Sequence, residues 1–154
     1  MQNSTVPQKR TRGFTLIELM VVIAIVALLV MVAMPAYDGY VRKTKRSLGK
    51  AELMSVMARQ EQFFVNNKQY ATTLTGLGYL ASPYAINQDG DEVAVTASGR
   101  IYQIAISNAS ATAFTLQAIP QGSQTKDTQC STLQITSVGV KSIVDGSGSA
   151  SDCW

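Results

Sequence analysis

Residues 14–34 read FTLIELMVVIAIVALLVMVAM, and this apolar run decides how the rest of the chain is organised. Glu18 carries its one charge, and the next charged residue along the chain is Asp38. At a rise of about 1.5 Å per residue, a helix of this length extends for roughly 30 Å, which is the thickness of the hydrocarbon core of a bilayer. The run therefore predicts a membrane-spanning helix.

Two other kinds of N-terminal segment share some of these features. A secretory signal peptide has an apolar region of about 7–15 residues followed by an A-x-A-like cleavage site, whereas this run is longer and ends in MPAY at 34–37. A signal anchor explains the basic residues Lys9, Arg10 and Arg12 ahead of the run, but it does not explain an acid inside the span. A carboxylate in hydrocarbon costs about a few kcal/mol, so we expect Glu18 to have a partner.

The partner that the sequence offers Glu18 is a new α-amino group. If the chain were cut after Gly13, Phe14 would carry a cationic N-terminus one helical turn from Glu18. The carboxylate could then pair with its own amine or with the amine of a neighbouring copy. The alternative is that Glu18 lies near the membrane surface and extends its carboxylate into the headgroup layer.

Composition limits the classes of function. The charged fraction is 15% and the apolar fraction 46%, which is the opposite of the balance in disordered chains. The chain has no histidine, which excludes Ser-His-Asp and Cys-His catalysis and every zinc site that contains histidine. The net charge of +3 comes from Lys9, Arg10 and Arg12, so the rest of the chain has no global attraction to nucleic acid.

The motif RGFTLIEL at 12–19, which follows the basic residues, resembles the processing site of type IV prepilins and related pseudopilins. The resemblance implies that residues 1–13 are a leader removed after Gly13 by a prepilin peptidase, and that the Phe14 amine is then methylated. It also implies that filaments assemble through the N-terminal helices, with Glu18 neutralising the Phe14 amine of an adjacent subunit. The protein would be the substrate of the peptidase and not an enzyme.

Residues 14–34 would form the membrane and filament-core helix, and residues 35–66 its amphipathic continuation. Pro35 lacks a backbone donor and should kink or open the helix. It could also end the helix, but the stretch that follows is rich in helix formers and has no further proline before residue 66. In assembled pili, the resemblance implies, the segment before such a proline is unwound, which gives Pro35 a role in assembly.

Apolar residues of the amphipathic half form two stripes at helical spacing. The first contains Leu48, Ala51, Met54, Ala58 and Val65, and the second contains Leu53, Met57 and Phe64. One stripe would cover a sheet of the same subunit and the other would face neighbouring helices; alternatively, both belong to one broad face towards the core.

Basic residues gather at the start of this half. They are Arg42, Lys43, Lys45, Arg46 and Lys50. Such a cluster could bind anionic lipid or DNA. A collar at the lipid headgroups is the simpler interpretation, since the helix must leave the membrane somewhere.

Residues 67–92 are interrupted by turn formers, namely Gly76, Gly78, Pro83, Asn87, Asp89 and Gly90, which predicts a connecting loop packed down by Tyr70, Tyr79 and Tyr84. The segment 87–92 (NQDGDE) has closely spaced oxygen ligands, but it lacks the complete EF-hand pattern, so a plain turn is favoured over a calcium site.

Residues 93–154 predict an antiparallel sheet of about four strands, because short turns join runs of β-forming residues. The runs are 93–96, 100–107, 113–119, 133–136 and 140–143. Packed on the amphipathic helix, such a sheet gives an α+β fold, which resembles the ladle shape of pilins.

Two cysteines, Cys130 and Cys153, are expected to form a disulfide outside the cytoplasm. Closing this loop stabilises the chain by roughly 3 kcal/mol. The polar tract 145–152 inside the loop is too small to pack well. The region from Lys126 to Trp154 resembles the disulfide-bounded region of type IVa pilins, and its ending is most similar to PilE-type minor pilins. In that family this region lies on the filament surface and meets partners.

These observations predict a structural subunit of a type IV pilus, and the ending favours a minor subunit over a major one. The resemblance implies a single-pass protein of the inner membrane with a periplasmic C-terminal domain, which moves into an extracellular pilus serving adhesion, twitching motility or DNA uptake. Its partners would be other pilin subunits, prepilin peptidase, the assembly platform in the inner membrane, membrane lipid, and a surface receptor or DNA.

Two other functions stay open. A pseudopilin of a type II secretion system is the nearer alternative, and a membrane-tethered enzyme is the remote one. No cofactor and no metal site is expected.

Overall fold

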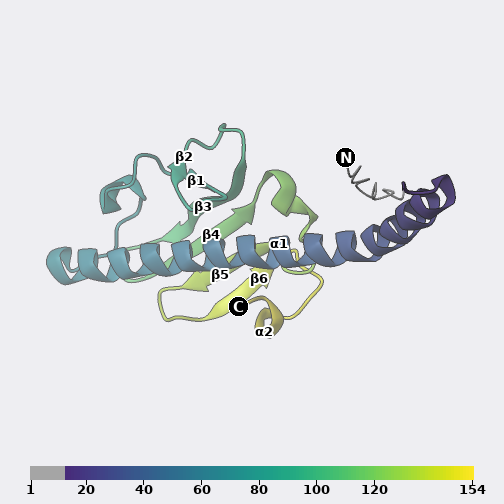
Figure 1. Ribbon diagram of the computed structural model, residues 1–154. Coiled ribbons are helices and arrows are strands. Elements are labelled where there is room, and N and C mark those ends of the chain that lie inside the picture. Colours follow the sequence, from purple (N-terminus) through teal and green to yellow (C-terminus); the bar gives the residue numbers. More distant parts are fainter. Residues whose placement is uncertain (1–12) are drawn as a thin grey trace, which may run out of the picture. The chain divides into compact units, whose positions relative to one another are not determined.

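The computed structural model describes residues 13–154; the basic residues Lys9, Arg10 and Arg12 of the expected leader lie outside the described residues. The chain divides into two compact units, Met1–Gly39 and Tyr40–Trp154. The elements follow the order α1 (Leu16–Asn67), η1 (Thr75–Leu77), β1 (Tyr84–Asn87), β2 (Glu92–Val93), β3 (Arg100–Ala109), β4 (Phe114–Pro120), η2 (Gly122–Lys126), β5 (Thr132–Thr136), β6 (Lys141–Val144) and α2 (Ala150–Cys153), as Figure 1 shows.

Helix α1 continues through Pro35 to Asn67, which confirms the predicted continuation of the helix beyond its apolar part. Within the described residues, α1 is the one helix long and apolar enough to cross a membrane, with a mean hydropathy of 3.1 in its most apolar window. No part of that window is buried by the rest of the described chain. Lipid or other apolar helices must therefore cover it.

The second unit contains a six-stranded sheet with the strand order β2-β1-β3-β4-β5-β6, and every neighbouring pair is antiparallel. The predicted α+β class with an antiparallel sheet is confirmed. The sheet has six strands where about four were expected, because each of the five predicted runs contributes a strand and part of the expected loop 67–92 joins them as β1. This strand pairs with β3, placing Ile86 opposite Tyr102.

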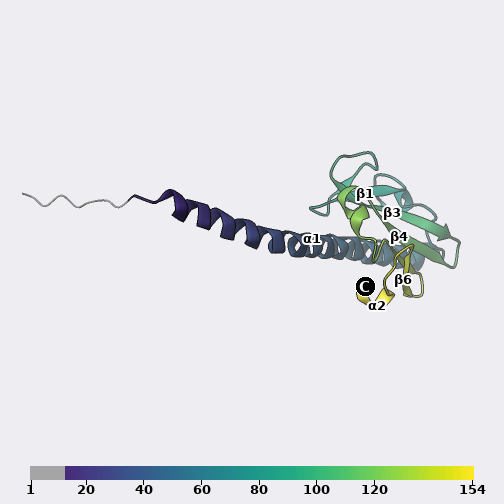
Figure 2. The ribbon, with the colours of Figure 1, turned by 90° about the vertical axis from the view of Figure 1, so that its right-hand side faces the viewer.

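The second half of α1 packs on this sheet, as both views of the ribbon show (Figure 1 and Figure 2). Its buried residues are Arg46, Gly49, Leu53, Val56 and Gln60, which recur every three or four positions and so share one face. A Cβ on Gly49 would lie 3.0 Å from the Tyr102 ring, so the glycine allows a close approach of α1 to β3.

The two predicted apolar stripes differ in burial. Leu53 and Met57 pack in or against the core, and the Phe64 ring lies 4.7 Å from the Tyr70 ring. The first stripe stays largely exposed, with Val65 at 65%, although its first member, Leu48, packs against the core. The alternative of one broad core-facing surface is therefore wrong.

A buried polar network joins α1 to η2. Arg46 donates two hydrogen bonds to the carboxylate of Asp127, at 2.9 and 2.7 Å. The side-chain amide of the fully buried Gln124 donates to the same carboxylate at 3.1 Å and to the Tyr102 hydroxyl at 3.0 Å. Burial raises the pKa of Tyr102 to about 12, so the phenol stays protonated in this network.

Tyrosines fasten the segment between α1 and β1, as predicted. Tyr79 and Tyr84 are buried and their rings stack at 4.6 Å. The Tyr84 hydroxyl donates to Glu52 of α1, and burial together with this carboxylate raises the pKa of Tyr84. Buried Gln60 adds a second attachment, because its amide both donates to the Ala71 carbonyl at 2.8 Å and accepts from the Ala71 N–H at 2.9 Å.

Replacing Asp127 with asparagine should destabilise the second unit by about 3 kcal/mol, since the buried Arg46 cation then loses its counter-charge. Urea unfolding of the full chain in detergent, followed by the fluorescence of the single tryptophan, measures the change. Asp89→Asn in an exposed turn is the matched control and should leave the midpoint unchanged. An unchanged midpoint for Asp127→Asn would show that the ion pair does not stabilise the fold.

Candidate functional site: an assembly motif and a basic surface

Glu18 lies at the start of α1, where its carboxylate accepts from the Thr15 N–H at 3.4 Å and from the Thr15 hydroxyl at 3.5 Å. The Thr15 hydroxyl in turn accepts from the Glu18 N–H at 3.3 Å. This reciprocal pair is a capping box, which satisfies free N–H groups at a helix start. The T-x-x-E signature of such a box is readable in the sequence at 15–18.

The capping geometry holds the carboxylate beside the predicted cleavage point. Phe14, which precedes Thr15, is 85% exposed, and Gly13 has open space where a side chain would be. Cleavage after Gly13 would give Phe14 a free α-amino group. Phe14 directly precedes Thr15, whose N–H already donates to the Glu18 carboxylate. The structure thus brings Gly13, Phe14 and Glu18 together in sequence and in space, while Pro35 lies inside α1.

Cys130 and Cys153 form a disulfide with their Cα atoms 5.5 Å apart, and both are fully buried. The tract 145–152 is better packed than expected, since the Gly148 N–H donates to the Gln129 carbonyl at 2.8 Å. Gly146 must be a glycine for this approach, because a Cβ there would lie 2.7 Å from the same carbonyl oxygen. Backbone contacts of this kind leave no apolar pattern in the sequence.

The predicted basic cluster is not one continuous surface. Arg46 is buried in its ion pair, and Lys45 donates to the Ser123 hydroxyl at 2.8 Å. Arg42, Lys43 and Lys50 are left without a carboxylate within 4 Å among the described residues.

A third lysine, Lys141, contacts the tryptophan, and both residues are far from Lys43 and Lys50 in the sequence. The ammonium of Lys141 in β6 lies 5.3 Å from the centre of the Trp154 ring. Burial lowers the pKa of Lys50, and the nearby cations Arg46, Lys141 and Lys43 lower it further. We refer to Lys43, Lys50, Lys141 and Trp154 as the basic–aromatic cluster. Periodicity could not find it, since Lys141 and Trp154 are far from Lys43 and Lys50 in the sequence.

The segment 87–92 makes the turn between β1 and β2, with Asn87 and Glu92 at the ends of those strands. The Asn87 side-chain oxygen accepts from the N–H groups of Asp89 and Asp91, both at 2.9 Å, so this oxygen is occupied by backbone donors. Glu92 accepts from the Leu80 N–H at 2.7 Å. Among residues 13–154 no group of three His, Cys, Asp or Glu side chains could hold a metal ion.

Comparisons with known proteins match both parts of the chain. Residues 35–134 match the family described as "Type IV minor pilin ComP, DNA uptake sequence receptor", and residues 8–34 match the prokaryotic N-terminal methylation motif. The chain is similar to the type IV major pilin protein PilA of Myxococcus xanthus, with 34% identity over 88 residues that cover 57% of this chain and 39% of that protein.

Two further relatives show similar partial coverage. The type II secretion system core protein G of Dickeya chrysanthemi is 33% identical over 73 residues, which are 47% of this chain and 48% of that protein. The type IV major pilin protein PilE1 of Neisseria gonorrhoeae is 35% identical over 72 residues, which are 47% of this chain and 44% of that protein. The chain thus spans less than half the length of these curated relatives.

Proposed function

The chain belongs to the family of type IV minor pilins described as ComP, and from this membership we propose that it is a subunit of a type IV pilus that binds DNA. Pilins are structural proteins, so the proposed activity is assembly and binding and not catalysis. The observation that carries the DNA part is the basic–aromatic cluster, in which Lys141 lies beside Trp154 and close enough to Lys50 to lower the pKa of that lysine.

The chemistry of the basic–aromatic cluster suits a nucleic-acid backbone. Lysines bind phosphates and release condensed counterions, which supplies affinity without sequence preference. Trp154 is partly exposed and offers a ring that can contact a sugar or a base, while its indole N–H donates to the Ser142 carbonyl at 2.9 Å and is thereby oriented. Lys50 lies on a helix and Lys141 on a strand, so both positions are fixed by the fold.

For assembly, we propose cleavage after Gly13, methylation of the Phe14 amine, and pairing of that amine with Glu18 of an adjacent subunit. The exposed apolar residues of α1 would leave the inner membrane and contact other subunits, with the second unit in the periplasm before assembly. Pro35 marks the place where α1 would loosen in the filament. The resemblance to core protein G keeps a secretion pseudopilin as the alternative, which the match to a minor-pilin family over residues 35–134 disfavours.

Mass analysis of the N-terminus tests processing. In membranes of cells with an active prepilin peptidase, the chain should start at a methylated Phe14, and in cells without the enzyme it should keep Met1. Material sheared from the cell surface should contain the processed form alone. A chain that keeps Met1 in the presence of the active enzyme would contradict membership of the filament.

Replacing Glu18 with glutamine should leave membrane insertion intact and reduce incorporation into sheared filaments, because a neutral amide cannot compensate the Phe14 amine. Glutamine can still accept from the Thr15 N–H, so the capping box is retained and the charge alone is tested. Quantitative blotting of both fractions gives the ratio of protein in sheared filaments to protein in the membrane. Normal incorporation would remove the proposed role of the carboxylate.

Replacing Lys50 or Lys141 with glutamine should weaken binding of the full chain in detergent to a labelled DNA duplex. Each substitution should also lower the slope of log affinity against log salt concentration by about 1. Fluorescence anisotropy over a range of salt concentrations measures both. Lys68→Gln, an exposed lysine just after α1, is the matched control and should bind like the native chain. Native binding by both variants would show that DNA, if bound, contacts another surface.

A further inference from the structure

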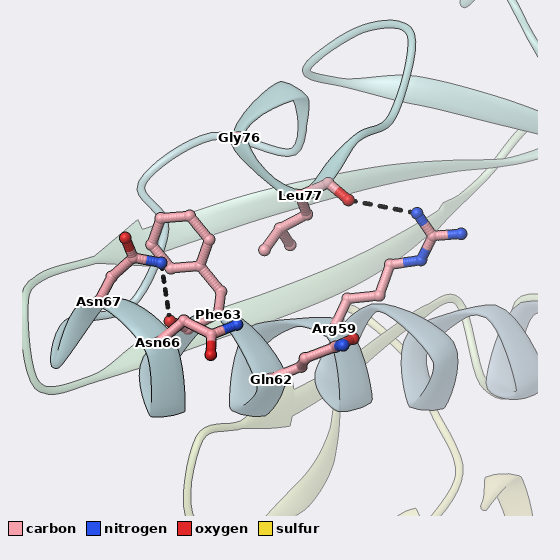
Figure 3. A pocket seen from close by; sticks show the side chains of 7 residues that line it. All are labelled: Arg59, Gln62, Phe63, Asn66, Asn67, Gly76 and Leu77. Carbon is pink, nitrogen blue, oxygen red and sulfur yellow. Dashed lines mark hydrogen bonds between the residues drawn. The ribbon is translucent and has the colours of Figure 1, made fainter.

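Two adjoining hollows lie between the C-terminal end of α1 and the segment that leads to β1. The first has a volume of about 240 Å³ and is lined by the residues of Figure 3: Arg59, Gln62, Phe63, Asn66, Asn67, Gly76 and Leu77. The second, of about 200 Å³, shares Phe63 and Gly76 with the first and is also lined by Gln69, Tyr70, Ala71, Thr72, Thr73 and Ala111. Each is smaller than the roughly 300–1,000 Å³ of a site for a drug-sized molecule, so each suits a small ligand.

Apart from the Arg59 guanidinium, the polar side chains around the hollows are uncharged amides and hydroxyls. Among the described residues, the side chains of Gln62 and Asn66 make no hydrogen bond at all. The Asn67 amide nitrogen donates to the Phe63 carbonyl at 3.0 Å, which leaves its oxygen as an acceptor (Figure 3). Carboxamides present both donors and acceptors, as do the hydroxyl groups of a polyol.

Aromatic rings supply the apolar part of the lining. The Phe63 ring rises from α1 towards the segment that carries Gly76 and Leu77 (Figure 3). Tyr70 borders the second hollow, and its hydroxyl donates to Glu61 at 3.0 Å. A pyranose has one face of C–H groups and a rim of hydroxyls. A flat apolar ring can pack on that face, and side chains that both donate and accept hydrogen bonds can bind the hydroxyls.

The one cation in the lining is already engaged. The Arg59 guanidinium donates to the Leu77 carbonyl at 3.2 Å, and its central carbon lies 4.5 Å from the centre of the Tyr79 ring. A phosphate or carboxylate would therefore have to compete with contacts that hold the segment to α1. This favours a neutral ligand over a nucleotide or an acidic sugar.

We propose that the two hollows around Phe63 form a binding site for a neutral saccharide of one or two rings. The site is separate from the basic–aromatic cluster, because Phe63 and Lys50 lie on opposite flanks of the buried face of α1. Binding of sugar and binding of DNA can therefore succeed or fail independently.

Gly76 provides a way to fill the site without disturbing the fold. A Cβ on this residue would make only ordinary contacts, at 3.5 Å from Ala71 and from Thr73. Gly76→Leu should therefore fold and occupy space that both hollows share. Asn66→Ala removes a free amide, and Gln88→Ala removes an exposed amide from the turn before β2 as the matched control.

The test is saturation-transfer NMR and titration on the full chain in a phosphocholine detergent, which has no sugar headgroup. The probes are N-acetylglucosamine, galactose, lactose and maltose, with glucuronic acid and deoxyadenosine monophosphate as charged comparisons. We expect transfer to at least one neutral sugar, with binding about tenfold weaker in Gly76→Leu, weaker in Asn66→Ala, and unchanged in Gln88→Ala. Binding should also be unchanged in Lys50→Gln.

Three results would overturn the proposal. One is an absence of transfer to every neutral probe, and the second is native binding by Gly76→Leu while its tryptophan fluorescence shows a native fold. The third is tighter binding of glucuronic acid or of the nucleotide than of the neutral sugars, since the ligand would then be an anion. None of these results bears on the binding of duplex DNA by the basic–aromatic cluster.

Discussion

The apolar half of α1 has no protein cover within the described chain, and this constraint governs the rest of the molecule. Its large side chains stay exposed, from 48% at Val30 to 77% at Leu16. Water is an unfavourable solvent for such a surface, so the segment needs lipid before assembly and other apolar helices after it. A subunit that moves from lipid into a filament needs the Glu18 carboxylate in a defined position. The hydrogen bonds of the capping box with Thr15 hold it there without any partner chain.

The second unit, by contrast, completes its own packing. Leu53 and Val56 supply the apolar centre of the contact between α1 and the sheet, and polar residues lie at its two ends. Arg46 binds Asp127 at one end, and Gln60 binds the Ala71 backbone at the other. Sliding or rotating the helix would leave both polar groups buried and unpaired, so these residues specify the position of α1 while the apolar ones stabilise it.

Sequence patterns predicted the parts of the fold that depend on neighbours in the chain. The apolar run and the alternation in β3 and β4 are local properties, and both were recognised. The burial of Arg46 was missed because its partner lies 81 residues away, and polar side chains do not register in a search for apolar periodicity. Strand β1 was missed because four residues in a stretch rich in turn formers acquire strand character only by pairing with β3. The basic–aromatic cluster was hidden for the same reason, since Lys141 and Trp154 are far from Lys50 in the sequence and only the fold brings the charge of Lys141 near it.

Different faces of α1 can contact different partners, because they point in different directions around the helix axis. At about 100° per residue, the face that carries Leu53 is covered by the sheet, and the exposed stripe that carries Ala58 points away from it. Lys50 lies on one flank between these two faces, and Phe63 lies on the other. Neighbouring subunits that contact the exposed stripe would therefore leave both flanks open. A pilin built in this way could keep the two proposed ligand-binding surfaces accessible while neighbouring subunits cover the exposed stripe.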